Sequence, residues 1–256
     1  MSLGMALTAL TGFKAAAHNN NVSAAKPGIV AKATKKKNKL KESNSSDIQV
    51  GLNNDKTISS NVIALYNQID FGGNKVSFDA FNKAYQGYLN LKKAGKLSGN
   101  DVISIADFSL ISTSKRLWVI DLAQKKVLFN TQVAHGQGSG NDFATVFSND
   151  EDSHQSSIGF FVTRSTYGGK HGTSLRIAGM DKGVNDNAEA RNVVIHPANY
   201  CSPSYLAQNK RIGRSWGCPA VSPELAQPII DTIEGGTMLF IYAPQAKYAS
   251  AWLHAS

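Results

Sequence analysis

Asn192-Val193-Val194-Ile195-His196 predicts a short β-branched strand that ends at a histidine. Pro197 follows directly and cannot continue the ladder as a donor, so the chain must turn there. The segment Ser215-Trp216-Gly217-Cys218 then places a cysteine 22 residues after the histidine. A buried strand would hold the imidazole rigidly at its end, where the ring can face a cleft.

The cysteine lies in a turn that favours display of its thiol. Gly217 can adopt a positive φ or let the backbone approach a ligand closely. A thiol after such a turn differs from the usual buried cysteine. A thiol and an imidazole, whose unperturbed pKa is near ~6.5, are the nucleophile and base of cysteine acyl transfer. We therefore predict Cys218 and His196 as the catalytic pair.

Acyl transfer also needs donors for a developing oxyanion. Pro219 has no N–H, so the candidates are the amides of Trp216, Gly217 and Cys218 or the hydroxyl of Ser215. A reactive thiol needs a lowered pKa, for which Arg214 and protonated His196 are the candidate causes. Ser215 and Gly217 thus join the predicted catalytic group.

Further polar residues around the pair are candidates for binding or positioning. Asn199 or a backbone carbonyl could orient the His196 ring. Arg214 is either a surface residue or a bidentate clamp for a carboxylate. Tyr167 and His171 belong to a Gly-rich loop that could line a groove beside Trp216, and His171 is an alternative base.

Charge and composition exclude several classes of protein. The 256 residues carry a net charge of +9, but residues 1–41 hold eight Lys and no acidic residue. The remainder is nearly neutral, with 19 basic and 18 acidic side chains. Neither a helix-turn-helix pattern nor an RNA-binding aromatic motif is present, so we predict no nucleic-acid partner. No apolar run reaches the length of a membrane span, and no paired metal-ligand spacing or cofactor motif appears.

The pattern divides the chain into four parts. Residues 1–47 are predicted to be a flexible Lys-rich segment with weak affinity for an anionic polymer or membrane surface, and an apolar stretch within it could be the remnant of an export signal. Residues 48–98 predict a small helical extension, with Ser77 as an N-cap. Residues 99–245 predict a catalytic β domain, and 246–256 a tail.

The β domain is predicted from short runs of period two. Residues 117–133 form a hairpin, and Gly168 to Gly172 form a turn. One late helix begins at Ser222 and Pro223, with a bend or a later start because of Pro228. The predicted strands are residues 102–108, 117–122, 127–133, 158–163, 174–177, 192–195 and 238–242. This order suggests a sandwich or barrel.

The motifs resemble the L,D-transpeptidase (YkuD-like) family of bacterial cell-wall enzymes. Gly213 to Val221, worded Gly-Arg-Ser-Trp-Gly-Cys-Pro-Ala-Val, is most similar to the murein L,D-transpeptidase catalytic-domain subfamily. Two positions depart from the commoner motif: Trp216 stands where a His is usual, and Pro219 replaces the start of a stretch that often holds an Arg. The resemblance implies a mostly-β, L,D-transpeptidase-like fold with a late helix and an N-terminal helical extension.

The resemblance also implies a function. Cys218 would attack the amide between the third residue of a peptidoglycan stem and the terminal D-Ala, and the thioester would pass to another stem, giving a 3→3 cross-link. The protein would then be periplasmic or secreted, with peptidoglycan stem peptides as partners and no cofactor. Two alternatives stay open: an L,D-carboxypeptidase-type hydrolase at the same site, or a non-catalytic wall-binding protein with a Cys201–Cys218 disulfide.

Overall fold

A computed structural model describes residues 60–98, 100–170, 172–244 and 248–254. All of these belong to one compact unit of the chain, Ser45–Ser256. The predicted Lys-rich segment and export remnant lie outside the described residues. Residues 60–68 are helical, as the spacing of Val62, Leu65 and Tyr66 predicts.

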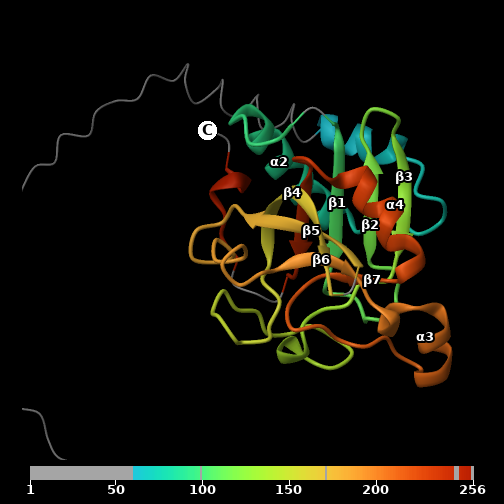
Figure 1. Ribbon diagram of the computed structural model, residues 1–256. Helices are drawn as coiled ribbons and strands as arrows, with labels where there is room; N and C mark the ends of the chain where they lie inside the picture. The colour runs from blue at the N-terminus through green and yellow to red at the C-terminus, as the bar shows by residue number, and fades with distance from the viewer. Residues whose placement is uncertain (1–59, 99, 171, 245–247, 255–256) are drawn as a thin grey trace, which may run out of the picture. The chain divides into compact units, whose positions relative to one another are not determined.

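Eight strands form one continuous bent sheet in the order β3-β2-β1-β8-β4-β5-β6-β7 (Figure 1). The pairs β1–β8 and β6–β7 are parallel, and the other pairs are antiparallel. The strands are β1 (Val102–Asp107), β2 (Leu117–Asp121), β3 (Lys126–Thr131), β4 (Gly159–Gly169), β5 (Gly172–Gly179), β6 (Val194–Pro197), β7 (Ala220–Val221) and β8 (Met238–Tyr242).

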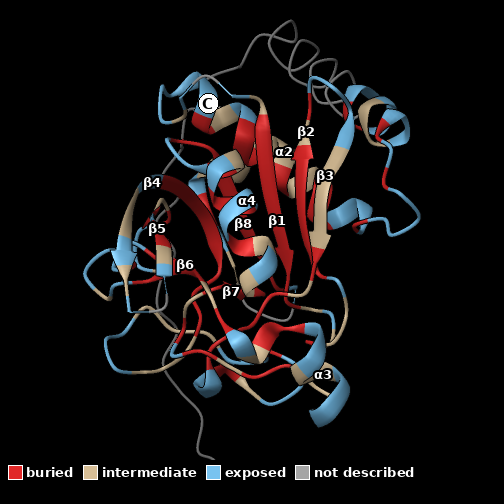
Figure 2. Ribbon diagram, turned by 45° about the vertical axis from the view of Figure 1, so that its right-hand side comes forward, coloured by how far each residue is buried: buried red, intermediate tan, exposed pale blue. Residues whose placement is uncertain are grey.

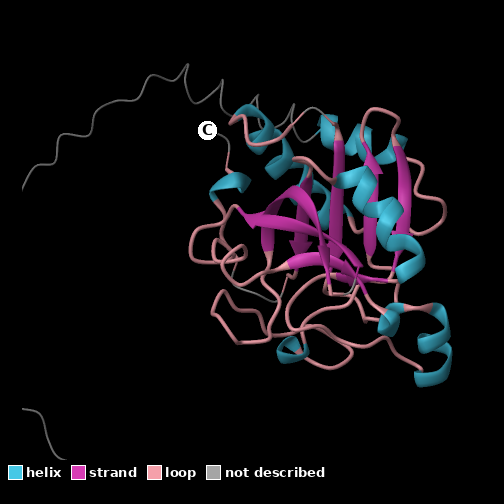
Figure 3. Cartoon of the chain, viewed as in Figure 1, coloured by secondary structure: helices cyan, strands magenta, loops and turns pink. Residues whose placement is uncertain are grey.

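Each face of the sheet is covered by a helix, because the central strands are apolar on both sides. Along β8, Met238 and Phe240 pack into the cluster that contains helix α2 (Phe78–Lys93). Leu239 and Ile241 pack into the cluster that contains helix α4 (Pro223–Ile233). Figure 3 shows these helices on either side of the strands. Figure 2 shows the buried central strands, with β3 half-buried at the edge.

The predicted N-terminus of α2 is confirmed in atomic detail. Ser77 has extended backbone angles, and its hydroxyl accepts a hydrogen bond from the Ala80 amide at 3.3 Å. Phe81, Ala84 and Leu91 then lie fully buried against the sheet. The helix therefore shares a core with the strands.

The strand predictions are confirmed in number and order up to β6, with differences in length. The turn predicted from Gly168 to Gly172 is shorter in the structure, because β4 continues to Gly169 and pairs there with Gly172 at the start of β5. Helix α4 begins at Pro223 and continues through Pro228, so the predicted later start was wrong, and the bend stays a prediction. Helix α3 (Pro203–Asn209), capped by the Ser202 hydroxyl, and the two-residue strand β7 were not predicted.

Candidate active site

The cysteine and the histidine are placed by neighbouring strands. Strand β6 carries His196, which pairs with Ala220 of β7, and Cys218 lies two residues before Ala220. The Cys218 Sγ lies 3.4 Å from the Val194 amide, which donates to it, and 3.7 Å from the Asn192 carbonyl. Val194 and His196 are alternate residues of one strand, so their side chains share a face. The sulfur is thus held against the strand that presents the imidazole.

The His196 ring is oriented by the backbone. Its Nδ1 lies 2.9 Å from the Pro197 carbonyl oxygen, and the side chain is only 7% exposed. A carbonyl can only accept, so Nδ1 carries the proton in this hydrogen bond and Nε2 keeps its lone pair. Of the two predicted ways to orient the ring, the structure shows the backbone carbonyl.

The thiol is half-buried, and burial raises the pKa of Cys218 above its ordinary value. The Val194 amide and the positive charge of Arg191 act in the opposite direction and lower this pKa. The predicted perturber Arg214 is not among these causes. Its guanidinium donates to the Gly140 carbonyl at 2.8 Å and to the Asn141 side chain at 2.9 Å, so it ties down the loop after β3.

The turn before the cysteine is held by its own residues. The Ser215 hydroxyl donates to the Cys218 carbonyl at 2.6 Å and accepts from the Gly217 amide at 3.1 Å. Gly217 has a φ of 121°, and a Cβ there would lie 2.8 Å from the Gln155 carbonyl. The backbone approach predicted for Gly217 is therefore an approach to the neighbouring loop.

Arg191 connects that loop to the site. Its guanidinium donates to the Ser148 and Gln155 carbonyls, each at 2.8 Å, and to the Ser157 hydroxyl at 2.6 Å. A second connection runs through Ser156, whose hydroxyl donates to the Gly217 carbonyl at 3.0 Å. Residues 148–157 therefore support the cysteine turn through these hydrogen bonds.

A buried Arg–His pair also supports the cysteine turn. The Arg116 guanidinium is fully buried and donates to Nδ1 of His135 at 2.7 Å and to the Val133 carbonyl. Burial lowers the pKa of His135 to about 4, which keeps this ring neutral and able to accept. The His135 carbonyl then accepts from the Ser215 amide at 3.0 Å. His135, for which no role was predicted, thus supports the cysteine turn.

Trp216 points away from this support. Its side chain is 72% exposed, and its ring stacks on His154 with 4.7 Å between the ring centroids. The two cysteines are free thiols. The Cys201 Sγ is buried and donates to the Ala220 carbonyl at 3.4 Å, and burial raises its pKa to about 12. The disulfide of the non-catalytic alternative is therefore wrong for this structure.

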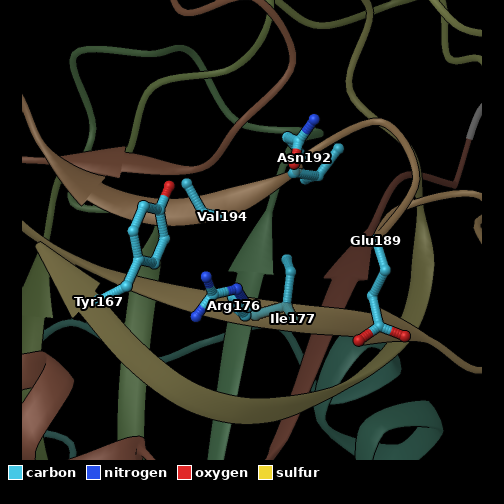
Figure 4. Close-up of a pocket in the computed structure, with 7 residues that line it drawn as sticks. Tyr167, Arg176, Ile177, Glu189, Asn192 and Val194 are labelled. Carbon is cyan, nitrogen blue, oxygen red and sulfur yellow. The ribbon is translucent and has the colours of Figure 1, made fainter. Parts of the chain in front are cut away.

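A cavity of about 270 Å³ lies at the strand segment whose backbone contacts the sulfur (Figure 4). The residues that contact the sulfur, Asn192 and Val194, form part of its wall, and Tyr167 stands at one end of it. The full lining consists of Tyr167, Arg176, Ile177, Glu189, Asn192, Val193 and Val194.

A second, more open depression lies beyond His196 and is lined by Pro197, Asn199 and Lys170, among others. Tyr167, predicted to line a groove, and Asn199, predicted to orient the histidine ring, thus line different depressions. His171 lies outside the described residues.

Three charged residues near the thiol were missed in the sequence: Arg191, Arg176 and Glu189. Each stands in a polar or alternating segment that matches no motif. Arg176 could have been found only from the register, which places it opposite Val194. The described residues contain no group of His, Cys, Asp and Glu suited to a metal ion.

A half-buried thiol, an imidazole oriented by a backbone carbonyl, and a cavity lined by the residues that contact the sulfur suit covalent acyl transfer in a mostly-β domain. Residues 73–242 match the family described as the L,D-transpeptidase catalytic domain. The match covers more than half of the chain, and the protein belongs to this family. Among the described residues, no helix has the length and apolar character that a membrane crossing requires.

Similar solved structures include three L,D-transpeptidases. The one from Mycobacterium smegmatis is 16% identical, with a TM-score of 0.35, and 57% of this chain covers 60% of it. L,D-transpeptidase 3 from Mycobacterium tuberculosis is 12% identical, with a TM-score of 0.36 and coverages of 57% and 62%. A mutant of the Enterococcus faecium enzyme is 16% identical, with a TM-score of 0.33 and coverages of 56% and 50%. The chain thus spans about 60% of the length of the first of these. No curated protein matches the chain.

Proposed function

We propose that this protein is a cysteine-dependent L,D-transpeptidase that acts on peptidoglycan stem peptides in the cell envelope, in the periplasm or outside the cell. The observation that carries the proposal is the position of the Cys218 sulfur against β6, where His196 is oriented by the Pro197 carbonyl. The family to which the chain belongs supplies the substrate class.

In the first half-reaction, Nε2 of His196 takes the thiol proton as the Cys218 sulfur attacks the carbonyl carbon of the penultimate residue. Because burial raises the pKa of this thiol, the proton moves during the attack rather than before it. The resulting oxyanion collapses, the carbon–nitrogen bond breaks, and the imidazolium returns its proton to the departing D-Ala amine. A thioester on Cys218 remains.

In the second half-reaction, an amine from another stem attacks the thioester. His196 takes a proton from the attacking nitrogen, the carbon–sulfur bond breaks, and the imidazolium returns that proton to the departing sulfur, which leaves as the thiol. The new amide is the 3→3 cross-link. Water in place of the amine would give hydrolysis with the same groups.

The hydrogen bonds within the cysteine turn reduce the number of candidate donors for the oxyanion. The Gly217 amide and the Ser215 hydroxyl both bond within the turn, so neither is directed at a substrate. We assign the oxyanion to the backbone amide of Cys218 itself, assisted by that of Trp216. Loss of one such donor typically costs ~3 kcal/mol of barrier lowering.

The test is incubation of the full chain with tetrapeptide-stem muropeptides, followed by mass spectrometry. We expect release of D-Ala and formation of 3→3 dimers, with neither product from Cys218→Ala. Cys201→Ala is the matched control, because that thiol is buried away from the cavity, and it should behave like the wild-type chain. Equal traces from wild type and Cys218→Ala would refute the proposal.

Tripeptide stems without dimers would assign the hydrolase alternative instead. The predicted contact of the Lys-rich segment with anionic polymers remains a separate proposal, because that segment lies outside the described residues. Binding of the full chain to peptidoglycan sacculi at rising salt would test it, since screening weakens such attraction.

A further inference from the structure

The cavity beside Cys218 contains two opposite charges that the proposed chemistry does not use. Arg176 and Glu189 both line it and both are exposed. Among the residues that the structure describes, ion pairs join Lys83 to Asp79 and Lys92 to Asp101, and neither cavity residue belongs to one. Both charges are therefore available to a ligand.

Arg176 is held in place by the ring of Tyr167. The centre of its guanidinium lies 4.3 Å from the ring centroid, which is the distance of a cation–π contact. Its Cα is the register partner of Val194, the residue whose amide contacts the Cys218 sulfur. A fixed guanidinium with free N–H groups is the side chain best suited to a carboxylate.

The two charges lie apart. Figure 4 shows Tyr167 and Arg176 together at one end of the cavity and Glu189 at the other, with Ile177 between them. Ile177, Val193 and Val194 also line the cavity, and all three are buried. The cavity is therefore matched to a ligand with a carboxylate at one end and an ammonium group at the other.

We propose that this cavity selects the acyl donor by charge at both ends, with Arg176 binding the C-terminal carboxylate of a peptide stem and Glu189 binding a free side-chain amine of the preceding diamino acid. This rests on the proposed function. It makes Arg176 and Glu189 the specificity-determining residues of the site. A free amino acid carries both charges on one carbon, so it cannot reach both ends at once.

The carboxylate subsite is tested by calorimetric binding to the inert Cys218→Ala chain. The probes are the stem tetrapeptide ending in diaminopimelate-D-Ala and the same peptide with a C-terminal amide. We expect about tenfold tighter binding of the acid, as one charge-assisted hydrogen-bonded contact supplies. Arg176→Gln should abolish this preference. Arg164→Gln, an exposed arginine on β4 outside the cavity, should keep it.

The amine subsite is tested in the same way with the free tetrapeptide and its side-chain N-acetyl derivative. Cys218→Ala should prefer the free amine by about tenfold, and Glu189→Gln should lose this preference while keeping the preference for the carboxylate. Glu234→Gln, an exposed residue after α4, is the matched control. Each variant thus loses one preference and keeps the other, which a general loss of folding could not produce.

The inference is overturned if Arg176→Gln and Glu189→Gln both keep both preferences, or if the Cys218→Ala chain shows neither. It is also overturned if free D-Ala binds as tightly as the tetrapeptide. These outcomes are independent of turnover. If D-Ala release depends on Cys218 but binding ignores both charges, the proposed function stands and this inference fails. If binding is selective for both charges but no D-Ala is released, this inference stands and the proposed function fails.

Discussion

The reactivity of Cys218 depends on single residues around its sulfur. Burial raises the pKa of the thiol, whereas Arg191 and the Val194 amide lower it. Replacement of Arg191 by Gln removes the positive charge, so the pKa of the thiol should rise further and the midpoint of alkylation by iodoacetamide should move to higher pH. The measurement is the rate of modification at Cys218 against pH, with the peptide identified by mass spectrometry.

Arg164→Gln is the control for loss of a cation far from the sulfur and should leave the alkylation midpoint in place. An unchanged or lower midpoint in Arg191→Gln would contradict the electrostatic role. Arg191 also ties down residues 148–157, so the circular dichroism spectrum must match that of the wild-type chain for the comparison to hold.

Gly217 is the residue on which the cysteine turn depends most. At a φ of 121°, with the Gln155 carbonyl 2.8 Å from an added Cβ, Gly217→Ala must either strain the backbone or move the turn. Such strain costs about 1–3 kcal/mol, and a displaced sulfur should lower D-Ala release more than it lowers the melting temperature. Gly168→Ala is the control, because a Cβ there meets nothing within 4 Å. Equal melting temperatures and activities in both variants would show that the turn tolerates a side chain.

Cys218, His196 and Gly217 were predicted from local patterns in the sequence, and the structure places the Cys218 sulfur against the strand that carries His196. Their catalytic roles stay predictions. The sequence was misleading for Arg214, since nothing local shows that its guanidinium is taken by the carbonyl of Gly140. Arg191 and Arg176 could not be found at all, because their positions follow from strand register and loop packing. Long-range geometry therefore decides the charges around the sulfur.

At the scale of an element, helix α2 docks on the sheet through a glycine. A Cβ on Gly87 would lie 2.1 Å from the ring of Phe160, which stacks on Phe240 at 4.4 Å in the core. Gly to Ala in a helix normally stabilises by about 1 kcal/mol. Here overpacking should reverse the sign, with a destabilisation of about 1–3 kcal/mol.

Chemical denaturation of Gly87→Ala measures this effect. Asn82→Ala, at a half-buried position of the same helix, provides the control and should be neutral or slightly stabilising, because Ala is the better helix former. A Gly87→Ala chain as stable as Asn82→Ala would mean that α2 can slide on the sheet.

The elements themselves were largely predictable, since apolar periodicity and Ser77 mark α2 and an apolar run marks β8. Strand β4 was predicted too short, because its second half is exposed and polar and is held by pairing with β5 rather than by an apolar face. Helix α3 has no buried residue, so it offers no periodic signal. Both errors arose because contacts with other parts of the chain, rather than a local apolar pattern, hold these segments in place.

At the scale of the whole molecule, Asp181 joins distant parts of the chain. One carboxylate oxygen accepts from the Phe160 amide and from the Tyr248 hydroxyl, each at 2.7 Å, and the other accepts from Ser250. These residues lie on β4 and in the C-terminal segment. Trp252 continues that segment, and its carbonyl accepts from Asn90 of α2 at 2.8 Å. No local pattern in the sequence predicts this connection.

Asp181→Asn tests the connection through its dependence on pH. An amide in place of the carboxylate turns an N–H toward a donor, so we expect a loss of about 1–3 kcal/mol in the free energy of unfolding. Burial raises the pKa of Asp181 above its ordinary value of 3.8. At a pH between the ordinary pKa of the unfolded chain and the raised pKa of the folded chain, the Asp181 carboxyl is protonated only in the folded chain. The stability of the fold therefore falls as the pH rises through this window. The variant lacks this titration, and its disadvantage should therefore be largest at acid pH and shrink toward neutrality.

Asp186→Asn is a control of opposite sign within the same loop. Hydrogen bonds from the Gly183 amide and the Asn149 side chain lower the pKa of Asp186, so its contribution is present above the ordinary value and is lost as the pH falls. Urea unfolding of the three chains across this range should therefore give differences from wild type that run in opposite directions with pH. If both variants followed the same trend, burial would not be what governs Asp181, and the C-terminal segment would be held by its other contacts, such as the bond from Trp252 to the Met180 carbonyl at 2.8 Å.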